Sequence, residues 1–250
     1  MPENQKKVWI TGASSGIGKA TAEKFAQEGW RVAVSARRKE LLDDMAKNDN
    51  IFSYPLDVVD EENCSNTFQK IISDFTEINL CIFCSGTYDP KKEKEIDLKQ
   101  SKFVMDVNYF GVLNCVKAVE KYYKDKRSGH ISIVSSIAGY RGLPNSSGYG
   151  PSKAALNNFA ESIFFDFKKY NVRISVISPG FIKTPLTDKN DFPMPFLRSV
   201  EFAAEKIYDG LNKSSSFEIH FPKQLTLILK FLRILPYKIY LFLIYKLYKR

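Results

Sequence analysis

The chain has 250 residues, 44% of them hydrophobic, and a formal net charge of +9 at pH 7. This length suits one α/β domain with a sizeable core, and the composition argues against an intrinsically disordered chain. Seven basic residues and no acidic ones follow Pro222, which leaves a charge of only +2 for residues 1–221. Nucleic-acid binding by the main body is therefore not indicated.

Strand-like and helix-like segments alternate along the chain. The predicted strands are Lys7–Ile10, Arg31–Ser35, Ile51–Leu56, Leu80–Cys84, His130–Val134, Val172–Ile177 and Phe217–Phe221. The predicted helices are Lys19–Ala26, Arg38–Ala46, Glu61–Phe75, Gln100–Tyr123, Tyr149–Tyr170 and Ser199–Leu211. Repeated βα units with apolar strands predict a three-layer, doubly wound α/β Rossmann fold with a mostly seven-stranded parallel sheet. Residues 181–196 carry three prolines and no periodic pattern, so we predict a loop there that could cover a site.

The glycine-rich turn Thr11–Gly18 lies between the first predicted strand and the first predicted helix. Its three glycines let the backbone turn tightly and approach a ligand closely. The free N–H groups at the start of the helix favour an anion such as a pyrophosphate. The spacing differs from G-x-G-x-x-G, and glycines also end strands for purely structural reasons. Because ligands bind at the carboxyl ends of the strands in such sheets, we predict a nucleotide site at this turn.

Two arginines follow the second predicted strand, where a carboxylate would bind the ribose diol of NAD. A guanidinium of Arg37 or Arg38 suits the 2′-phosphate of NADP, because its forked donors match phosphate oxygens. We therefore predict NADP rather than NAD, the alternative being two solvated arginines that begin a helix. Asp57, after the third strand, could hydrogen-bond the adenine or cap the following helix.

Tyr149 and Lys153 open a long predicted helix, and residues at i and i+4 share a helix face. A neighbouring ammonium favours tyrosinate, so we expect Lys153 to lower the pKa of the Tyr149 phenol from about 10. The phenol would then serve as an acid or base nearer neutral pH. Ser135 and Ser136 follow the fifth strand, and a hydroxyl there can reach the same cleft and polarise a carbonyl. Tyr-x-x-x-Lys alone is weak support, because an exposed helix often carries the pair by chance.

Together with the glycine turn, this pattern resembles the short-chain dehydrogenase/reductase family from about Lys7 to Phe221. The resemblance implies a catalytic set of Asn108, Ser136, Tyr149 and Lys153. With the assignments above, the predicted cofactor-binding residues are Gly12, Ser14, Ser15, Gly16, Ile17, Gly18, Arg37, Arg38, Asp57, Gly86, Asn108, Tyr149, Lys153, Pro179, Gly180, Ile182 and Thr184.

The resemblance also implies a role for each catalytic residue. Tyr149 exchanges a proton with the substrate oxygen, and Ser136 holds that oxygen. Lys153 binds the nicotinamide ribose and keeps the tyrosine pKa low, while Asn108 holds a water in the proton relay. Hydride passes between the nicotinamide and the carbonyl carbon. The segment Phe83–Gly86 departs from the family's Asn-Asn-Ala-Gly, which we expect to affect stability and cofactor placement more than chemistry. A homodimer or homotetramer is also implied.

Residues 222–250 extend past the family core, which we take as a domain of residues 1–221. The basic residues of this extension are Lys223, Lys230, Arg233, Lys238, Lys246, Lys249 and Arg250. The uncharged run between Lys238 and Lys246 has seven residues, far fewer than the roughly 20 that span a bilayer. Interleaved basic, aromatic and apolar residues suit an amphipathic segment that lies beside anionic lipid. Packing on the body, a role in the substrate lid and an oligomer contact are the alternatives.

The cysteines and histidines indicate the cellular compartment and argue against a metal site. The cysteines are Cys64, Cys81, Cys84 and Cys115, few and irregularly spaced, which suits a reducing compartment. Cys81 and Cys84 lie on a strand-like run, so we expect small buried hydrophobic residues rather than a redox pair. His130 and His220 lie among β-type residues, and we predict no metal site. The polar N-terminus is unlike a secretion signal, so we expect a cytoplasmic protein, with or without peripheral contact to the cytoplasmic face of a membrane.

Two functions from different classes remain open. The first is an oxidoreductase that transfers a hydride between NADP(H) and a carbonyl or secondary alcohol of a hydrophobic, lipid-like or steroid-like substrate. The second is a catalytically silent nucleotide-binding sensor or scaffold docked on a membrane or partner. The presence of Ser136, Tyr149 and Lys153 favours the enzyme.

Overall fold

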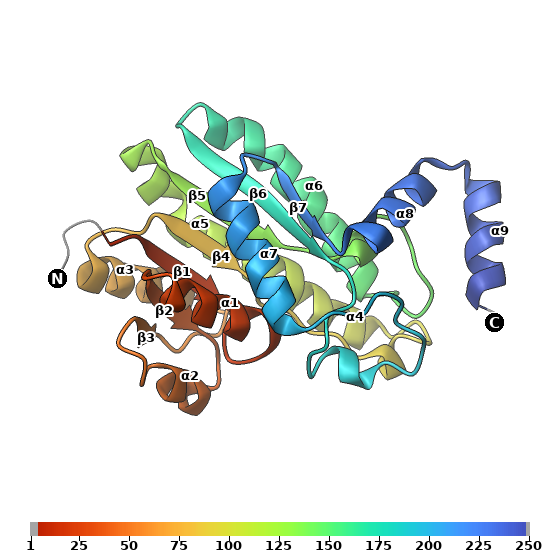
Figure 1. The fold of residues 1–250 in the computed structure, drawn as a ribbon, viewed down its shortest axis with the longest axis horizontal. Helices are drawn as coiled ribbons and strands as arrows, with labels where there is room; N and C mark the ends of the chain where they lie inside the picture. The colour runs from red at the N-terminus through yellow and green to blue at the C-terminus, as the bar shows by residue number, and fades with distance from the viewer. Residues whose placement is uncertain (1–4, 249–250) are drawn as a thin grey trace.

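One parallel sheet organises the computed structural model, which describes residues 5–248. Its seven strands have the order β3-β2-β1-β4-β5-β6-β7 (Figure 1). The strands are β1 Lys7–Thr11, β2 Arg31–Ser35, β3 Ile51–Ser53, β4 Leu80–Phe83, β5 Gly129–Val134, β6 Val172–Pro179 and β7 Glu218–Phe221. The strand order reverses between β1 and β4, which is the switch point of a doubly wound fold. The predicted fold class is therefore confirmed.

Helices cover both faces of this sheet (Figure 1). Within residues 5–248 the α-helices are α1 Gly16–Gln27, α2 Lys39–Met45, α3 Glu61–Phe75, α4 Leu98–Met105, α5 Gly111–Lys126, α6 Tyr149–Lys168, α7 Val200–Lys213, α8 Lys223–Ile234 and α9 Tyr237–Tyr248. Side chains of α3, α5 and α6 form one hydrophobic cluster, and those of α1, α2 and α7 form another. Trp9 packs in the first cluster, whereas Val8 and Ile10 pack in the second, because successive strand residues point to opposite faces.

The strand register brings the glycine turn to one edge of the sheet. Thr11, the last residue of β1, lies opposite Ser35 of β2 and Phe83 of β4. The residues that follow these three strands therefore meet at the same carboxyl edge. Ligands bind at this edge in open α/β sheets.

The long helix predicted at Gln100–Tyr123 is interrupted. Asp106–Phe110 forms a π-helical turn between α4 and α5, and all its flanking residues keep right-handed helical backbone. Such single turns insert an extra residue into a helix and are frequent at functional sites. Asn108 lies in this turn. Two strand ends also differ from expectation by more than one residue, since β3 ends at Ser53 and β6 continues to Pro179.

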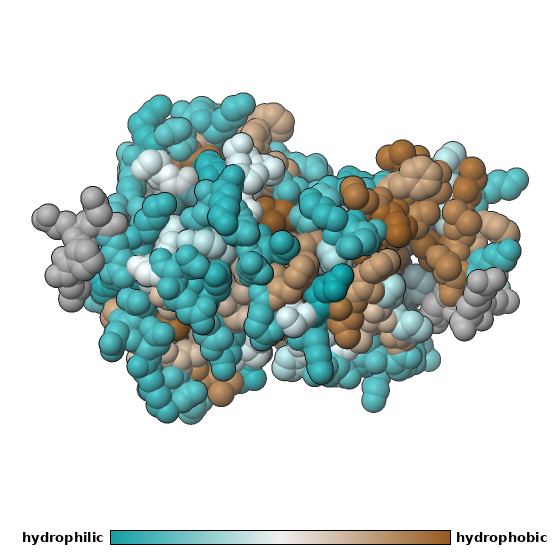
Figure 2. Space-filling model, viewed as in Figure 1, coloured by the Kyte–Doolittle hydropathy of each residue, from teal (hydrophilic) through white to brown (hydrophobic). Residues whose placement is uncertain are grey.

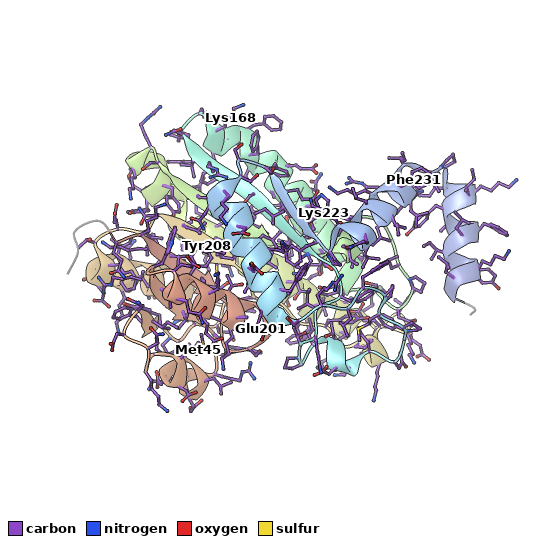
Figure 3. The ribbon with its side chains drawn as sticks, in the orientation of Figure 1. Met45, Lys168, Glu201, Tyr208, Lys223 and Phe231 are labelled. Carbon is purple, nitrogen blue, oxygen red and sulfur yellow. The ribbon has the colours of Figure 1, made fainter. Side chains whose placement is uncertain are left out.

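The C-terminal extension forms two further helices beyond β7. Figure 1 shows α8 leading away from the sheet and α9 at the far edge of the molecule. Lys223 begins α8 and Phe231 lies near its other end (Figure 3). Pro236 separates the two helices, as its lack of a backbone N–H would favour. None of the helices in residues 5–248 combines the length and apolar character needed to cross a membrane.

Candidate active site

A cavity of about 410 Å³ opens at the carboxyl edge of the sheet. It is bordered by the residues that follow β1, β2, β3, β4, β5 and β6, together with the start of α6. The predicted residues that line it are Gly12, Ser14, Ser15, Gly16, Ile17, Gly18, Arg37, Arg38, Asp57, Gly86, Ser136, Tyr149, Lys153, Pro179, Gly180, Ile182 and Thr184. Of the predicted site residues, only Asn108 does not line it. The tertiary structure thus brings segments from most of the chain to one place.

The glycine turn requires glycine at two positions. Gly12 has φ +70°, and a Cβ there would lie 2.7 Å from the backbone N of Ser85. A Cβ at Gly18 would lie 2.3 Å from the carbonyl oxygen of Gly12. Because neither position carries a Cβ, the loop can fold closely over the end of β1. This brings the N-terminus of α1 to the cavity.

The N-terminus of α1 has no acidic partner of its own. Ser15, the residue before the helix, makes no side-chain capping hydrogen bond, and the first turn contains no acidic residue. The first backbone N–H groups of a helix otherwise need such acceptors. Ser15 and the residues Gly16–Gly18 line the cavity, so an anionic group there fits this donor set. The diphosphate of a dinucleotide is such a group.

Arg38 joins the end of β2 to the glycine turn. Its Nη2 donates hydrogen bonds to the hydroxyl oxygens of Ser14 at 2.8 Å and Ser15 at 2.9 Å. Arg37 and Arg38 both line the cavity, and no carboxylate occupies the end of β2. This corner therefore presents guanidinium and hydroxyl donors together.

Asp57 lines the same corner but does not cap α3. Its Oδ1 accepts a hydrogen bond from the backbone N of Val59 at 3.2 Å, within a local turn. The N-cap of α3 is Asp60, whose side chain accepts from the backbone N of Asn63. Of the two roles considered for Asp57, helix capping is thus excluded, and adenine binding stays a prediction.

Ser136, Tyr149 and Lys153 meet in the cavity wall. Ser136 follows β5, Tyr149 is the first residue of α6, and Lys153 lies one turn later. The Nζ of Lys153 donates to the carbonyl oxygen of Val134 at 2.9 Å and lies 5.7 Å from the centre of the Tyr149 ring. The lysine side chain is almost fully buried, so its ammonium faces the cavity and not bulk solvent.

The prediction that Lys153 lowers the pKa of the Tyr149 phenol is wrong for the protein's own groups, because that pKa is raised. Burial raises the pKa of the Tyr149 phenol to about 12, and hydrogen bonding from Ser136 only partly opposes this, while Cys84 and Glu93 raise it further. Burial also lowers the pKa of Lys153 to about 8. Removing either group from water disfavours its charged form, and for the phenol this outweighs the hydrogen bond from Ser136. The phenol is therefore held as a proton donor.

Asn108 does not line the cavity but hydrogen-bonds two of the segments that form it. Its Oδ1 accepts from the backbone N of Thr87 at 2.6 Å, and its Nδ2 donates to the Thr87 carbonyl and to the Ser152 hydroxyl, both at 3.0 Å. Ser152 in turn donates to the carbonyl oxygen of Tyr149 at 2.7 Å. The side chain thus links the loop after β4 to the first turn of α6. Its implied role in a water relay stays a prediction.

Glu93 is a site residue that the sequence did not indicate. Its carboxylate accepts hydrogen bonds from the backbone N of Gly148 at 3.0 Å and of Tyr149 at 3.1 and 3.0 Å, and its side chain is 3% exposed. It lies in the charged run Lys91–Glu95, a pattern typical of a solvated loop. Tyr88, from the same loop, packs its ring 4.7 Å from that of Tyr149. No local signal could have assigned either residue.

Cys84 differs from the expected buried cysteine. Cys81 is fully buried beside the hydroxyl of Tyr123, but Cys84 is only half-buried and lines the cavity. The two side chains lie on opposite faces of the sheet, an arrangement that does not favour a bond between them. A residue directly after a central strand lies at the edge where ligands bind, and this position could have identified Cys84.

The proline-rich loop also borders the cavity. Its lining residues are Ile182, Thr184, Pro185, Leu186, Thr187 and Lys189. A bridge between Ile182 and Arg198 closes the base of the loop. Among residues 5–248, no group of three or more His, Cys, Asp or Glu could hold a metal ion.

Comparisons with known proteins agree with this geometry. The sequence profile of the short chain dehydrogenase family matches residues 6–193. An uncharacterized oxidoreductase of Myxococcus xanthus is 32% identical over 232 residues, which cover 91% of each chain. The 3-oxoacyl-[acyl-carrier-protein] reductase of Thermotoga maritima is 34% identical over 190 residues, 72% of this chain and 75% of that protein. A short chain dehydrogenase from Burkholderia cenocepacia, solved in complex with NADP, has a TM-score of 0.79 and 25% identity over 94% of this chain and 95% of that one. The chain therefore belongs to the short-chain dehydrogenase family of oxidoreductases.

Proposed function

We propose that the protein transfers a hydride between NADP(H) and a carbonyl or secondary alcohol of a hydrophobic substrate. The observation that carries this proposal is the meeting of Ser136, Tyr149 and Lys153 in one cavity with the glycine turn. Acid, hydroxyl and ammonium groups are then available beside the place where a dinucleotide fits. The dinucleotide supplies the hydride when bound.

The protein's own groups supply the proton chemistry. In the reducing direction, the carbonyl carbon gains the hydride and its oxygen takes the proton of the Tyr149 phenol. A pKa of about 12 keeps this phenol protonated throughout the physiological range. The Ser136 hydroxyl holds the same oxygen, and the buried ammonium of Lys153 stabilises the phenolate that remains. In the oxidising direction the same groups act in reverse.

The preference for NADP rests on the corner beside the glycine turn. Arg37 and Arg38 line the cavity there, and Arg38 already hydrogen-bonds Ser14 and Ser15. A 2′-phosphate suits these forked donors better than a ribose hydroxyl does. Similar solved structures hold NADP in one case and NAD in another, so the choice rests on the two arginines.

The hydrophobic substrate is supported by the side chains around Ser136 and Tyr149. Ile137 and Tyr140 follow Ser136 and pack with Leu225 of α8 and with Phe181. These four residues form a hydrophobic cluster and do not themselves line the cavity, whose own apolar lining includes Val107, Ile182 and Leu186. An apolar lining of this kind fits an alkyl chain or ring system. The Thermotoga maritima relative is described as acting on 3-oxoacyl chains, which agrees with such a pocket.

An activity screen tests the proposal. Long-chain ketones, 3-oxoacyl thioesters and oxo-steroids are incubated with NADPH, whose absorbance is followed. We expect turnover by the wild type and a loss of about 10²–10⁴-fold in kcat for Tyr149→Phe, since the proton donor is removed. NADPH binding, followed by fluorescence, should persist in this variant. NADPH binding by the wild type with no turnover of any carbonyl would support the sensor or scaffold instead.

A further inference from the structure

We propose that α8 and α9 form a docking surface for an anionic lipid bilayer and lie in the plane of its interface. We call this the C-terminal surface. Its most exposed large apolar side chains are Phe231, Ile234, Tyr237, Leu241, Phe242 and Leu247. The proposal concerns where the protein binds and does not depend on its catalytic activity.

The C-terminal surface exposes far more apolar area than an isolated surface residue would. Ile234 is 76% exposed, Tyr237 75% and Phe242 61%. Figure 2 shows hydrophobic residues gathered over this end of the molecule, while the rest of the visible face is mostly hydrophilic. Contiguous exposed apolar surface marks an interaction site, since water contact with it costs free energy.

The charges on the same helices favour anionic lipid. Arg233, Lys238 and Lys246 are exposed basic residues, and residues 222–250 contain no Asp or Glu. Lys230 contributes less positive charge to this surface, because its ammonium forms an ion pair with Glu218 at 2.5 Å. A second copy presenting the same surface would bring like charges together with no acid to offset them. Negatively charged lipid headgroups would neutralise these basic residues, while the apolar side chains enter the region between the headgroups and the acyl chains.

Contacts of Arg141 hold the end of α8 and the start of α9 against the body of the protein. Arg141, five residues after Ser136, donates from Nη1 to the carbonyl oxygens of Leu232 at 3.1 Å, Arg233 at 3.1 Å and Leu235 at 2.7 Å. Its guanidinium also lies 4.5 Å from the Tyr237 ring centre and 4.0 Å from that of Tyr240. Lys and Arg side chains that satisfy the last carbonyls of a helix stabilise its end.

A second contact holds α9 itself. Tyr240 is 3% exposed and donates its hydroxyl hydrogen to the carbonyl oxygen of Gly142 at 2.7 Å. The helix is thus anchored through the buried Tyr240, while the other large side chains described between residues 237 and 247 are exposed or half-buried. A tail that merely packed on the body would turn its apolar side inward.

The length of α9 decides how it meets the membrane. Its 12 residues are about 18 Å long, against about 30 Å of hydrocarbon in a bilayer. The helix is therefore too short to cross and suits the interface. Leu225 in the first turn of α8 lies beside Gly180, a residue of the cavity wall. Helix α8, which carries part of the C-terminal surface, thus begins next to the active-site cleft.

Vesicle flotation with the full chain tests the proposal. Vesicles of phosphatidylcholine alone are compared with vesicles that also contain phosphatidylglycerol. We expect the protein to float with the anionic vesicles and to be released by salt, because the attraction to headgroups is screened. No flotation with either vesicle would overturn the proposal, as would equal flotation with both that salt does not change.

Matched variants locate the contact. Lys238→Gln with Lys246→Gln should weaken binding by at least tenfold, at about fivefold per cation. Lys117→Gln with Lys169→Gln removes two exposed lysines from the body, and we expect no change. Phe231→Ser with Phe242→Ser should abolish flotation, whereas Phe165→Ser, at a still more exposed aromatic residue of α6, should not.

Sedimentation equilibrium distinguishes lipid from a second copy. If Phe231→Ser with Phe242→Ser converts a wild-type oligomer to monomer and the wild type does not bind vesicles, the surface is an oligomer contact and the proposal fails. Thermal melts of all variants verify folding. Flotation needs no turnover, so a failure of the proposed enzymatic function leaves this result interpretable.

Discussion

The carboxylate of Glu93 accepts hydrogen bonds from the backbone N of Tyr149, at 3.1 Å to Oε1 and 3.0 Å to Oε2. The loop after β4 thereby fixes the first turn of α6, on which the proton donor lies. A negative charge at the N-terminus of a helix is also favoured by the helix dipole. Glu93 is thus a positioning residue that never needs to touch the substrate.

Replacing Glu93 should separate its structural and electrostatic effects. Glu93→Ala leaves two buried N–H groups unpaired, which should lower the free energy of unfolding by about 1–3 kcal/mol and reduce kcat. Glu93→Gln keeps an acceptor but removes the negative charge that raises the pKa of Tyr149. The pKa of the phenol should then fall, and the rise of kcat/KM with pH for alcohol oxidation should shift to lower pH.

Glu95→Gln is the matched control, because Glu95 is exposed two residues away in the same loop. We expect wild-type stability and an unchanged pH profile. If Glu93→Gln also leaves the profile in place, the proposed electrostatic effect of Glu93 on Tyr149 is wrong.

The buried lysine should produce an alkaline limit to reduction. Burial lowers the pKa of Lys153 to about 8, so its ammonium loses charge as pH rises through that value. The Tyr149 phenol, with a pKa of about 12, stays protonated there. Steady-state rates with NADPH should therefore show kcat/KM falling above about pH 8. In Lys153→Arg the positive charge persists at alkaline pH, so any residual activity should not fall above about pH 8. A wild-type kcat/KM that stays flat well into the alkaline range would contradict the lowered pKa of Lys153.

The choice of cofactor should depend on Arg38. Arg38→Ala should raise the Kd for NADPH by roughly tenfold or more, because a charge-assisted hydrogen bond to phosphate is lost. Binding of NADH should change much less. Fluorescence titration measures both, and Lys39→Ala is the control, since Lys39 is exposed and paired with Asp43. Equal losses for the two nucleotides would mean that Arg38 acts only by holding Ser14 and Ser15.

Stability should fall in acid because of His130. Its ring is buried against the Ser175 hydroxyl, at 2.8 Å, and burial lowers its pKa from 6.5 to about 3. The unfolded chain therefore binds a proton before the folded one does, and the stability present above pH 6.5 is lost as pH falls towards 3. This group alone should cost about 2 kcal/mol between about pH 7 and about pH 5. Denaturant unfolding should show a shallower pH dependence for His130→Gln, and an identical slope would contradict the assignment.

Much of the site could be predicted because its determinants are local or topological. Apolar strands that alternate with helices specify a parallel sheet, and the carboxyl ends of its strands then share one edge. The glycine turn, the residues after β2 and β5, and the start of α6 all follow from that placement. The spacing of Tyr149 and Lys153 needed only the helical period.

The sequence by itself determined the sheet, the edge where the cavity lies and the residue types that line it, since these depend on short-range periodicity and chain order. Only the tertiary structure decided that Glu93 holds the start of α6, that Arg141 anchors α8 and α9, and that the Tyr149 phenol is a weaker acid than expected. The first two are contacts between segments about 55 and 90 residues apart, which no local pattern encodes. The third is the balance of burial against charge, which depends on every group packed around the phenol.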